Sequence, residues 1–217
     1  MIIVPSDRSI IRLKSTYADL LSGRIRDRNS SPKEVTDALI ATGFELGRAI
    51  AEILPIESSP IVTPMGDSID AVTFPESWNL VVTTKQDSNT LGYALRCAIG
   101  NAYLGFIDFG RYRGQDVLSA PVREISFPAV LPPIQNVIVG KTVLATGCTA
   151  ISLVRYALEK TGADKLIVAT AFYSIEAIGE LRSEFPNVTV VCVGNPDRLD
   201  ENGMLRPGVG LIERRVA

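Results

Sequence analysis

Short apolar runs alternate with amphipathic stretches through the last third of the chain. The runs at 137–139, 166–169 and 188–193 are apolar except for Thr189 and rich in valine, which is typical of strands buried on both faces. Between them, apolar residues at helical spacing predict helices over 149–160 and 174–184. This alternation predicts an α/β fold, with helices on both faces of a parallel sheet. In such sheets, ligands bind at the carboxyl ends of the strands.

The earlier part of the chain combines one long helix with shorter elements. Ser31 and Pro32 have the residue types of a helix cap and a first helical residue, and apolar spacing predicts a helix over 32–54. The polar stretch 22–34 predicts a connector, and the four prolines within 113–135 predict an irregular excursion or a β-arm. The remaining expected elements are a hairpin over 61–74, a strand at 80–83, a helix from about 89 to 101 capped by Ser88 or Asn89, and a strand at 103–109.

Length and composition fit one domain. The chain has 217 residues, of which 46% are hydrophobic and 21% are charged, so it has enough apolar surface to bury a core. We treat residues 1–217 as a single domain with three parts. These are an N-terminal helical part (1–58), a part holding the hairpin, the central strands and the arm (59–135), and a core α/β part (136–217).

Composition also excludes several kinds of site. The chain has no histidine, which excludes histidine-based triads, histidine metal sites and histidine general bases. Lys and Arg number 22 against 24 Asp and Glu, so the formal charge of -2 gives no drive toward nucleic acid or a membrane. No segment approaches the roughly 20 apolar residues of a spanning helix. Cys97, Cys148 and Cys192 are too few for a zinc site and show no disulfide pattern, so we expect small buried side chains in a soluble cytoplasmic protein.

Small and hydroxyl residues lie between the 137–139 strand and the next predicted helix. Residues 140–149 read Gly-Lys-Thr-Val-Leu-Ala-Thr-Gly-Cys-Thr. Backbone N–H groups, threonine hydroxyls and the helix dipole at such a turn suit a phosphate; an ordinary tight turn is the equal alternative. The Gly-Lys-Thr triplet is not a Walker A loop, because the required first glycine is Gln135. The candidate phosphate-binding residues are Ala145, Thr146, Gly147, Cys148 and Thr149.

Three motifs together resemble the uracil phosphoribosyltransferase family. They are Leu-Ala-Thr-Gly at 144–147, the run from Leu199 to Gly210, and Gly-Arg-Tyr-Arg at 110–113. Their order and spacing agree with the family from about 103 to 210, and the resemblance is looser before that. It implies a type I phosphoribosyltransferase fold. It also implies a homo-oligomer that joins a pyrimidine base to phosphoribosyl diphosphate with Mg²⁺, releasing pyrophosphate.

The resemblance assigns roles to further residues. Leu205 and Gly210 fall where the family contacts uracil through main-chain groups, and Met204 lies beside them. Arg113 is either a phosphate contact or a solvated arginine, and Glu176 is either a site acid or a first-turn charge that complements the helix dipole. Cys148 is either a nucleophile at a helix N-terminus or a small loop residue, the reading we favour. Trp78 and Tyr103 are interpreted as packing residues, and the candidates for diphosphate or a second anion are Lys141, Arg113 and Lys85.

The sequence departs from the family at three functional elements. Lys141 occupies the slot of the acid that engages the ribose hydroxyls, and a cation cannot accept their hydrogen bonds, although it can bind another phosphate or a carboxylate. Gln86 replaces the arginine of the diphosphate loop Leu-Arg-Ala-Gly, and Leu211 replaces an aspartate associated with the metal, with Glu213 as a partial substitute. Three hypotheses follow: a transferase with altered diphosphate and metal elements, a paralogue that binds a nucleotide without turnover, and a different reaction on such a ligand.

Overall fold

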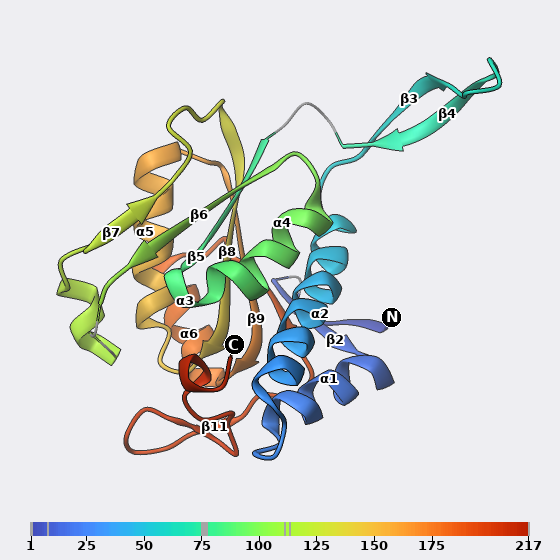
Figure 1. Cartoon of the computed structure of the whole chain (residues 1–217). Coiled ribbons are helices and arrows are strands. Elements are labelled where there is room, and N and C mark those ends of the chain that lie inside the picture. The colour runs from blue at the N-terminus through green and yellow to red at the C-terminus, as the bar shows by residue number, and fades with distance from the viewer. Residues whose placement is uncertain (1, 8, 75–77, 111, 113, 217) are drawn as a thin grey trace.

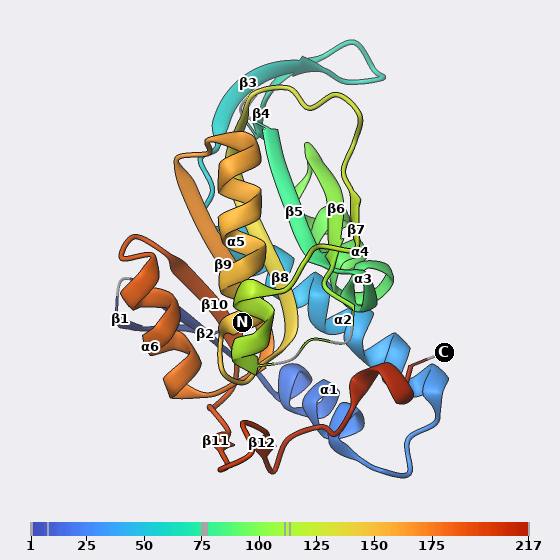
Figure 2. The same cartoon turned by 90° about the vertical axis from the view of Figure 1, so that its left-hand side faces the viewer.

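The computed structural model describes residues 2–7, 9–74, 78–110, 112 and 114–216. Its centre is a sheet in which eight strands of the described chain are joined in the order β1-β2-β10-β9-β8-β5-β6-β7. Figures 1 and 2 show helices on both sides of this sheet. The strands of the sheet are β1 (Ile2–Asp7), β2 (Ile10–Lys14), β5 (Trp78–Thr84), β6 (Ala102–Asp108), β7 (Glu124–Ser126), β8 (Ile134–Leu144), β9 (Lys165–Tyr173) and β10 (Thr189–Val193).

The strands in the middle of the sheet are parallel. β2, β10, β9, β8, β5 and β6 pair in parallel, whereas β1 and β7 are antiparallel strands at the two ends of the order. The carboxyl ends of the six parallel strands therefore meet at one edge, which is the lower edge in Figure 1. This arrangement confirms the predicted α/β class and creates one edge at which a ligand site can form.

Alternate residues of the strands pack against different helices, because neighbouring side chains on a strand point to opposite faces. Val81 and Ile138 lie in one buried cluster with residues of the helices α2 and α4. Leu80, Val82 and Val139 lie in a second cluster with residues of α5 and α6. Both faces are thus covered, and this explains the continuous apolar runs in the sequence.

The helices begin and end at recognisable signals. Ser31 caps α2 and forms a capping box with Glu34, while Gly162 ends α5 in the left-handed conformation. The helix predicted over 32–54 is confirmed but ends at Ala51. The α-helices are α1 (Thr16–Arg26), α2 (Pro32–Ala51), α3 (Lys85–Asp87), α4 (Tyr93–Ile99), α5 (Cys148–Thr161) and α6 (Ile175–Glu184). A π-helical turn, η1 (Ser88–Gly92), joins α3 to α4. Two 3₁₀ turns are η2 (Gly114–Ser119) and η3 (Ile212–Arg214).

Three sequence predictions are wrong in their bounds. Residues 22–26 are not a connector but the end of α1, which buries Leu21 and Ile25 and leaves Arg24 exposed. The helical segment predicted from 89 already begins at Lys85, and its cap is Thr84. The strand predicted at 137–139 runs from 134 to 144, so Lys141 lies in a strand and only a short turn precedes α5.

Two smaller elements stand at opposite ends of the sheet. The hairpin of β3 (Glu57–Val62) and β4 (Ser68–Thr73), predicted over 61–74, projects away from the body in Figure 1. At the other end lies the pair β11 (Arg198–Leu199) and β12 (Leu205–Arg206).

Cys148 and Cys192 are buried as expected, whereas Cys97 is exposed; all three are free thiols. Among the described residues, no helix is both long and apolar enough to cross a membrane.

Candidate functional site

A cavity of about 330 Å³ lies at the carboxyl ends of the parallel strands. Its walls come from four parts of the chain that are distant in sequence. These are the end of β5 with α3, the end of β6 with the 3₁₀ turn η2, the end of β8 with the start of α5, and the segment after β11. The described lining residues used below are Gln86, Asp87, Asp108, Lys141, Ala145, Thr146, Gly147, Thr149, Gly203, Met204, Gly210, Leu211 and Glu213.

The predicted phosphate turn forms one wall of this cavity. Ala145, Thr146, Gly147 and Thr149 line it, while Cys148 is buried. Gly147 precedes α5 with a φ of 85°, a left-handed conformation that favours glycine. The turn delivers the first N–H groups of a 14-residue helix to the cavity, and such groups have no partner within the helix. The N–H donors and the partial positive charge of the helix N-terminus at this wall therefore suit an anionic group.

Lys141 and Asp87 form an ion pair at the cavity wall. Lys141 Nζ donates to Asp87 Oδ2 at 2.6 Å, and Thr84 Oγ1 donates to the same oxygen at 2.8 Å. The Asp87 side chain is 4% exposed and that of Lys141 is 17% exposed. Burial raises the pKa of Asp87, but the Lys141 ammonium and the hydrogen bonds from Lys141 and Thr84 outweigh it and hold that pKa below its usual value. The partner of Lys141 is thus a carboxylate of the chain itself.

The predicted base-binding segment faces the phosphate turn. Met204 and Gly210 line the cavity, and a Cβ built on Gly203 would lie 3.3 Å from Thr146 Cγ2. Leu205 is different, because its side chain is buried in the cluster that includes Leu21, and it is not among the described lining residues. The structure brings the two motifs within reach of one small ligand, with Leu205 packed behind them.

Two arginines fasten this segment to the end of α1. Arg26 makes a bidentate pair with Asp197, at 2.9 and 3.0 Å, and also donates to the carbonyl of Gly208 at 3.0 Å. Its guanidinium lies 4.6 Å from the centre of the Phe172 ring. Arg215 donates to the carbonyls of Ile25 and Asp27 and, at 3.0 Å, to that of Val209. Hydrogen bonds from two arginines therefore hold this segment against the end of α1. Neither arginine is among the site residues predicted from the sequence.

The other predicted site residues occupy varied positions. Lys85 donates to Glu124 at 2.6 Å on the surface and is not among the described lining residues. Glu176 is exposed in the first turn of α6, which favours its reading as a charge on the helix dipole. Glu213 does line the cavity. Arg113 lies outside the described residues.

Two acids of the cavity, Asp87 and Asp108, are not among the site residues predicted from the sequence. Asp87 follows directly after Gln86 in α3, in the stretch that is predicted to replace the family's diphosphate loop. Asp108 is the last residue of β6, and its Oδ1 accepts a hydrogen bond from the N–H of Gly110 at 2.8 Å. Both were detectable in principle, because each follows or ends a predicted strand at the edge where ligands bind.

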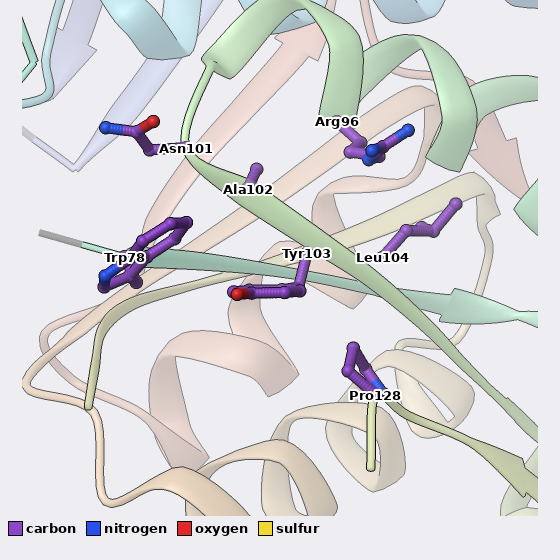
Figure 3. A pocket seen from close by; sticks show the side chains of 7 residues that line it. All are labelled: Trp78, Arg96, Asn101, Ala102, Tyr103, Leu104 and Pro128. Atoms are coloured by element: carbon purple, nitrogen blue, oxygen red, sulfur yellow. The ribbon is translucent and has the colours of Figure 1, made fainter. Parts of the chain in front are cut away.

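A second hollow, of about 510 Å³, lies at the amino ends of β5 and β6. Figure 3 shows its lining, with Trp78 and Tyr103 side by side on neighbouring strands. Their ring centroids are 5.3 Å apart and the rings are tilted by 37°. Both also pack against the buried cluster under α5, as expected of packing residues. This hollow lies at the edge of the sheet opposite the phosphate turn.

Comparison with known proteins gives a consistent result. The profile of the family described as "Uracil phosphoribosyltransferase" matches residues 12–215. A curated relative with this name from Brevibacillus brevis is 26% identical over 204 residues, which cover 94% of this chain and 92% of that relative. Another from Pyrobaculum arsenaticum is 22% identical over 194 residues, covering 89% and 92%.

Solved structures show the same fold. The structure of the AQ2163 protein from Aquifex aeolicus has a TM-score of 0.80 at 23% identity, covering 95% of this chain and 97% of that one. Adenine phosphoribosyltransferase from Trypanosoma brucei, solved with AMP, pyrophosphate and ribose-5-phosphate, has a TM-score of 0.55 at 12% identity. It covers 89% of this chain, and 86% of that chain is matched.

Proposed function

The chain belongs to the uracil phosphoribosyltransferase family, and on this basis we propose that it is a nucleobase phosphoribosyltransferase. It would form a nucleoside monophosphate from a pyrimidine-like base and phosphoribosyl diphosphate, with altered diphosphate and metal elements. One observation carries this proposal. The phosphate turn at 145–149 and the base-binding segment with Met204 and Gly210 line the same cavity, although they come from separate parts of the chain.

In this proposal each wall of the cavity has a task. The N–H groups and hydroxyls of the turn bind the 5′-phosphate, and main-chain groups near Gly210 orient the base. Transfer of the phosphoribosyl group needs the base nitrogen to lie in line with the departing pyrophosphate, so positioning supplies much of the rate. The positive charge that develops on the ribose needs no histidine, which the chain lacks.

The family resemblance implies Mg²⁺, but the residues present do not fit a protein-bound metal. Mg²⁺ takes oxygen ligands such as carboxylates, and the buried carboxylate of Asp87 is already bound to an ammonium and a hydroxyl. Within the described part of the chain, no group of three acids or cysteines is placed to hold an ion. The described side chains of the cavity therefore do not form a metal site of their own.

The transferase proposal is tested by pyrophosphate release. The purified protein is incubated with phosphoribosyl diphosphate and, one at a time, uracil, other pyrimidines and the purine bases, with Mg²⁺ and with EDTA. We expect release with a pyrimidine-type base only. If none of the bases gives pyrophosphate release in either buffer, the transferase proposal is wrong.

A binding protein without turnover is the second candidate. The observation that favours it is the pair between Lys141 and Asp87, because the two opposite charges neutralise each other and add no net positive charge for a diphosphate. This candidate predicts binding of uridine monophosphate in calorimetry together with silence in the pyrophosphate assay. If uridine monophosphate does not bind, this second candidate is wrong.

We also propose that the chain forms a homo-oligomer through the β3–β4 hairpin. The hairpin projects from the body and exposes apolar side chains, with Val62, Met65 and Val72 each more than two-thirds accessible. The free thiols support a reducing, cytoplasmic setting as part of the same proposal.

A further inference from the structure

The wall of the cavity beside the phosphate turn carries a cation and an anion that are bound to each other. Lys141 comes from β8 and Asp87 from α3, and their side chains meet at 2.6 Å. The two strands that end here, β5 and β8, are neighbours in the sheet, so their pairing fixes both groups at the same edge. The pair is therefore a fixed part of the cavity.

Both members of the pair are shielded from water. Asp87 is 4% and Lys141 17% exposed, so solvent screens their attraction weakly. Thr84 occupies a second hydrogen-bonding position on the same carboxylate oxygen. A divalent cation bound to the Asp87 carboxylate would have to displace the Lys141 ammonium or lie next to it. Two positive charges in direct contact in a shielded site repel each other strongly.

The remaining acids of the described cavity wall do not supply a replacement set. Asp108 accepts the N–H of Gly110 at 2.8 Å, and Glu213 comes from the separate turn η3 near the end of the chain. Together with Asp87 they form no cluster suited to an ion in the ranges that the structure describes. Asp87 and Asp108 thus have hydrogen-bond partners within the chain, and Glu213 comes from a separate turn.

The ammonium of Lys141 keeps donor capacity for a ligand. A lysine ammonium has three N–H donors, and the hydrogen bond to Asp87 uses one of them. Lys141 lines the cavity three residues before Leu144, after which the phosphate turn begins. Hydroxyl and phosphate oxygens of a phosphorylated ribose can accept hydrogen bonds from such a group.

We infer that this site binds its phosphorylated ribose ligand without a divalent metal, and that Lys141 donates to that ligand while Asp87 positions the ammonium. The inference rests on the proposed function, because it takes the cavity to be the phosphoribosyl site. It goes further in naming the group that acts in place of a metal and in excluding a metal requirement for binding.

The first test uses the unmodified protein. Uridine monophosphate and phosphoribosyl diphosphate are each titrated by calorimetry in EDTA and in excess Mg²⁺. We expect binding in both buffers, with no tightening by Mg²⁺. Tightening of phosphoribosyl diphosphate binding by about tenfold or more in Mg²⁺, a change of about 1.4 kcal/mol, would overturn the inference and leave the proposed function intact. Absence of binding by both ligands in both buffers would overturn both.

The second test removes the pair while keeping the wall neutral. The double variant Lys141→Met with Asp87→Leu replaces a buried ion pair by apolar residues, a change that proteins often tolerate. We expect cooperative unfolding to persist and the Kd of uridine monophosphate to rise about tenfold, the size expected for a lost charged hydrogen bond. An unchanged Kd in a folded double variant would overturn the role of Lys141. If the double variant does not fold, the metal titration of the unmodified protein still decides the inference.

Lys33→Met is the matched control for the lysine substitution. Lys33 makes an ion pair with Asp37 at the same 2.6 Å, but on the exposed surface of α2. We expect its Kd for uridine monophosphate to stay within about twofold of the unmodified protein, because exposed pairs contribute little.

Discussion

Gly147 fixes the shape of the phosphate turn. Its φ is 85°, and a Cβ at this position would lie 3.2 Å from the carbonyl oxygen of Ala177. We expect Gly147→Ala to lower the free energy of unfolding by about 1–2 kcal/mol, because a side chain is strained in the left-handed conformation. The same change should weaken binding of uridine monophosphate, since the N–H groups of the turn shift. Urea unfolding and calorimetry measure the two effects.

Gly179 provides the matched control within α6. A Cβ on Gly179 meets nothing within 4 Å, so Gly179→Ala should stabilise the helix by about 0.5–1 kcal/mol and leave binding unchanged. Equal loss of stability in both variants would contradict the role assigned to the Gly147 conformation.

Single residues of the site were predictable only where a local pattern marked them. The turn at 145–149 follows an apolar run and precedes a helix, so its place at the cavity could be read from the sequence. The ion pair of Lys141 could not, because its partner Asp87 lies 54 residues earlier and the contact depends on β5 being the neighbour of β8. Leu205 shows the reverse difficulty, since its neighbours line the cavity but its own side chain turns into the core.

At the scale of elements, the segment after β10 depends on its attachment to α1. Asp197 is 6% exposed and Arg26 is its bidentate partner. We expect Arg26→Met to lower the free energy of unfolding by about 2 kcal/mol, because it leaves a buried carboxylate without its cation. It should also raise the Kd for uridine monophosphate and speed proteolysis within residues 198–210. Urea unfolding, calorimetry and limited proteolysis provide the measurements.

Arg206→Met is the control in the same segment. Arg206 pairs with Asp200 on the surface and is 64% exposed, so its loss should change stability by no more than about 1 kcal/mol. If the two arginine variants behave alike, the attachment to α1 does not position the segment.

Elements with strong periodicity were predicted best. The helix α2 has both a capping box and a regular apolar face, and its start was found at the right residue. The helix α1 was missed because its buried residues, Leu21 and Ile25, are separated by charged and small ones that read as a connector. The length of β8 was underestimated because Lys141 interrupts the apolar run, although its polar end is needed at the cavity.

The fold class of the protein follows from the alternation of strands and helices along the sequence. The strand order does not, because β2 from the N-terminus pairs with β10 near the other end of the chain. No local pattern encodes that pairing. The convergence of the phosphate turn, the acids and the base-binding segment on one cavity is a property of this order, and the sequence alone could only suggest it through family resemblance.

The proposed oligomer gives a prediction for the intact protein. We expect the unmodified chain to sediment as a species heavier than the 23.4 kDa monomer. The double variant Val62→Lys with Val72→Lys should shift it toward the monomer, because charges on an apolar contact surface oppose association. Sedimentation of the unmodified protein at the monomer mass would contradict the proposal.

We propose that the cavity at the carboxyl ends of the strands is a phosphoribosyl site. A crystal structure of the protein with uridine monophosphate tests it most directly. We expect the phosphate at the N–H groups of residues 146–149, the base beside Met204 and Gly210, and the Lys141 ammonium within hydrogen-bond distance of the ligand. Nucleotide bound elsewhere, for example in the hollow beside Trp78 and Tyr103 with the cavity left empty, would contradict it.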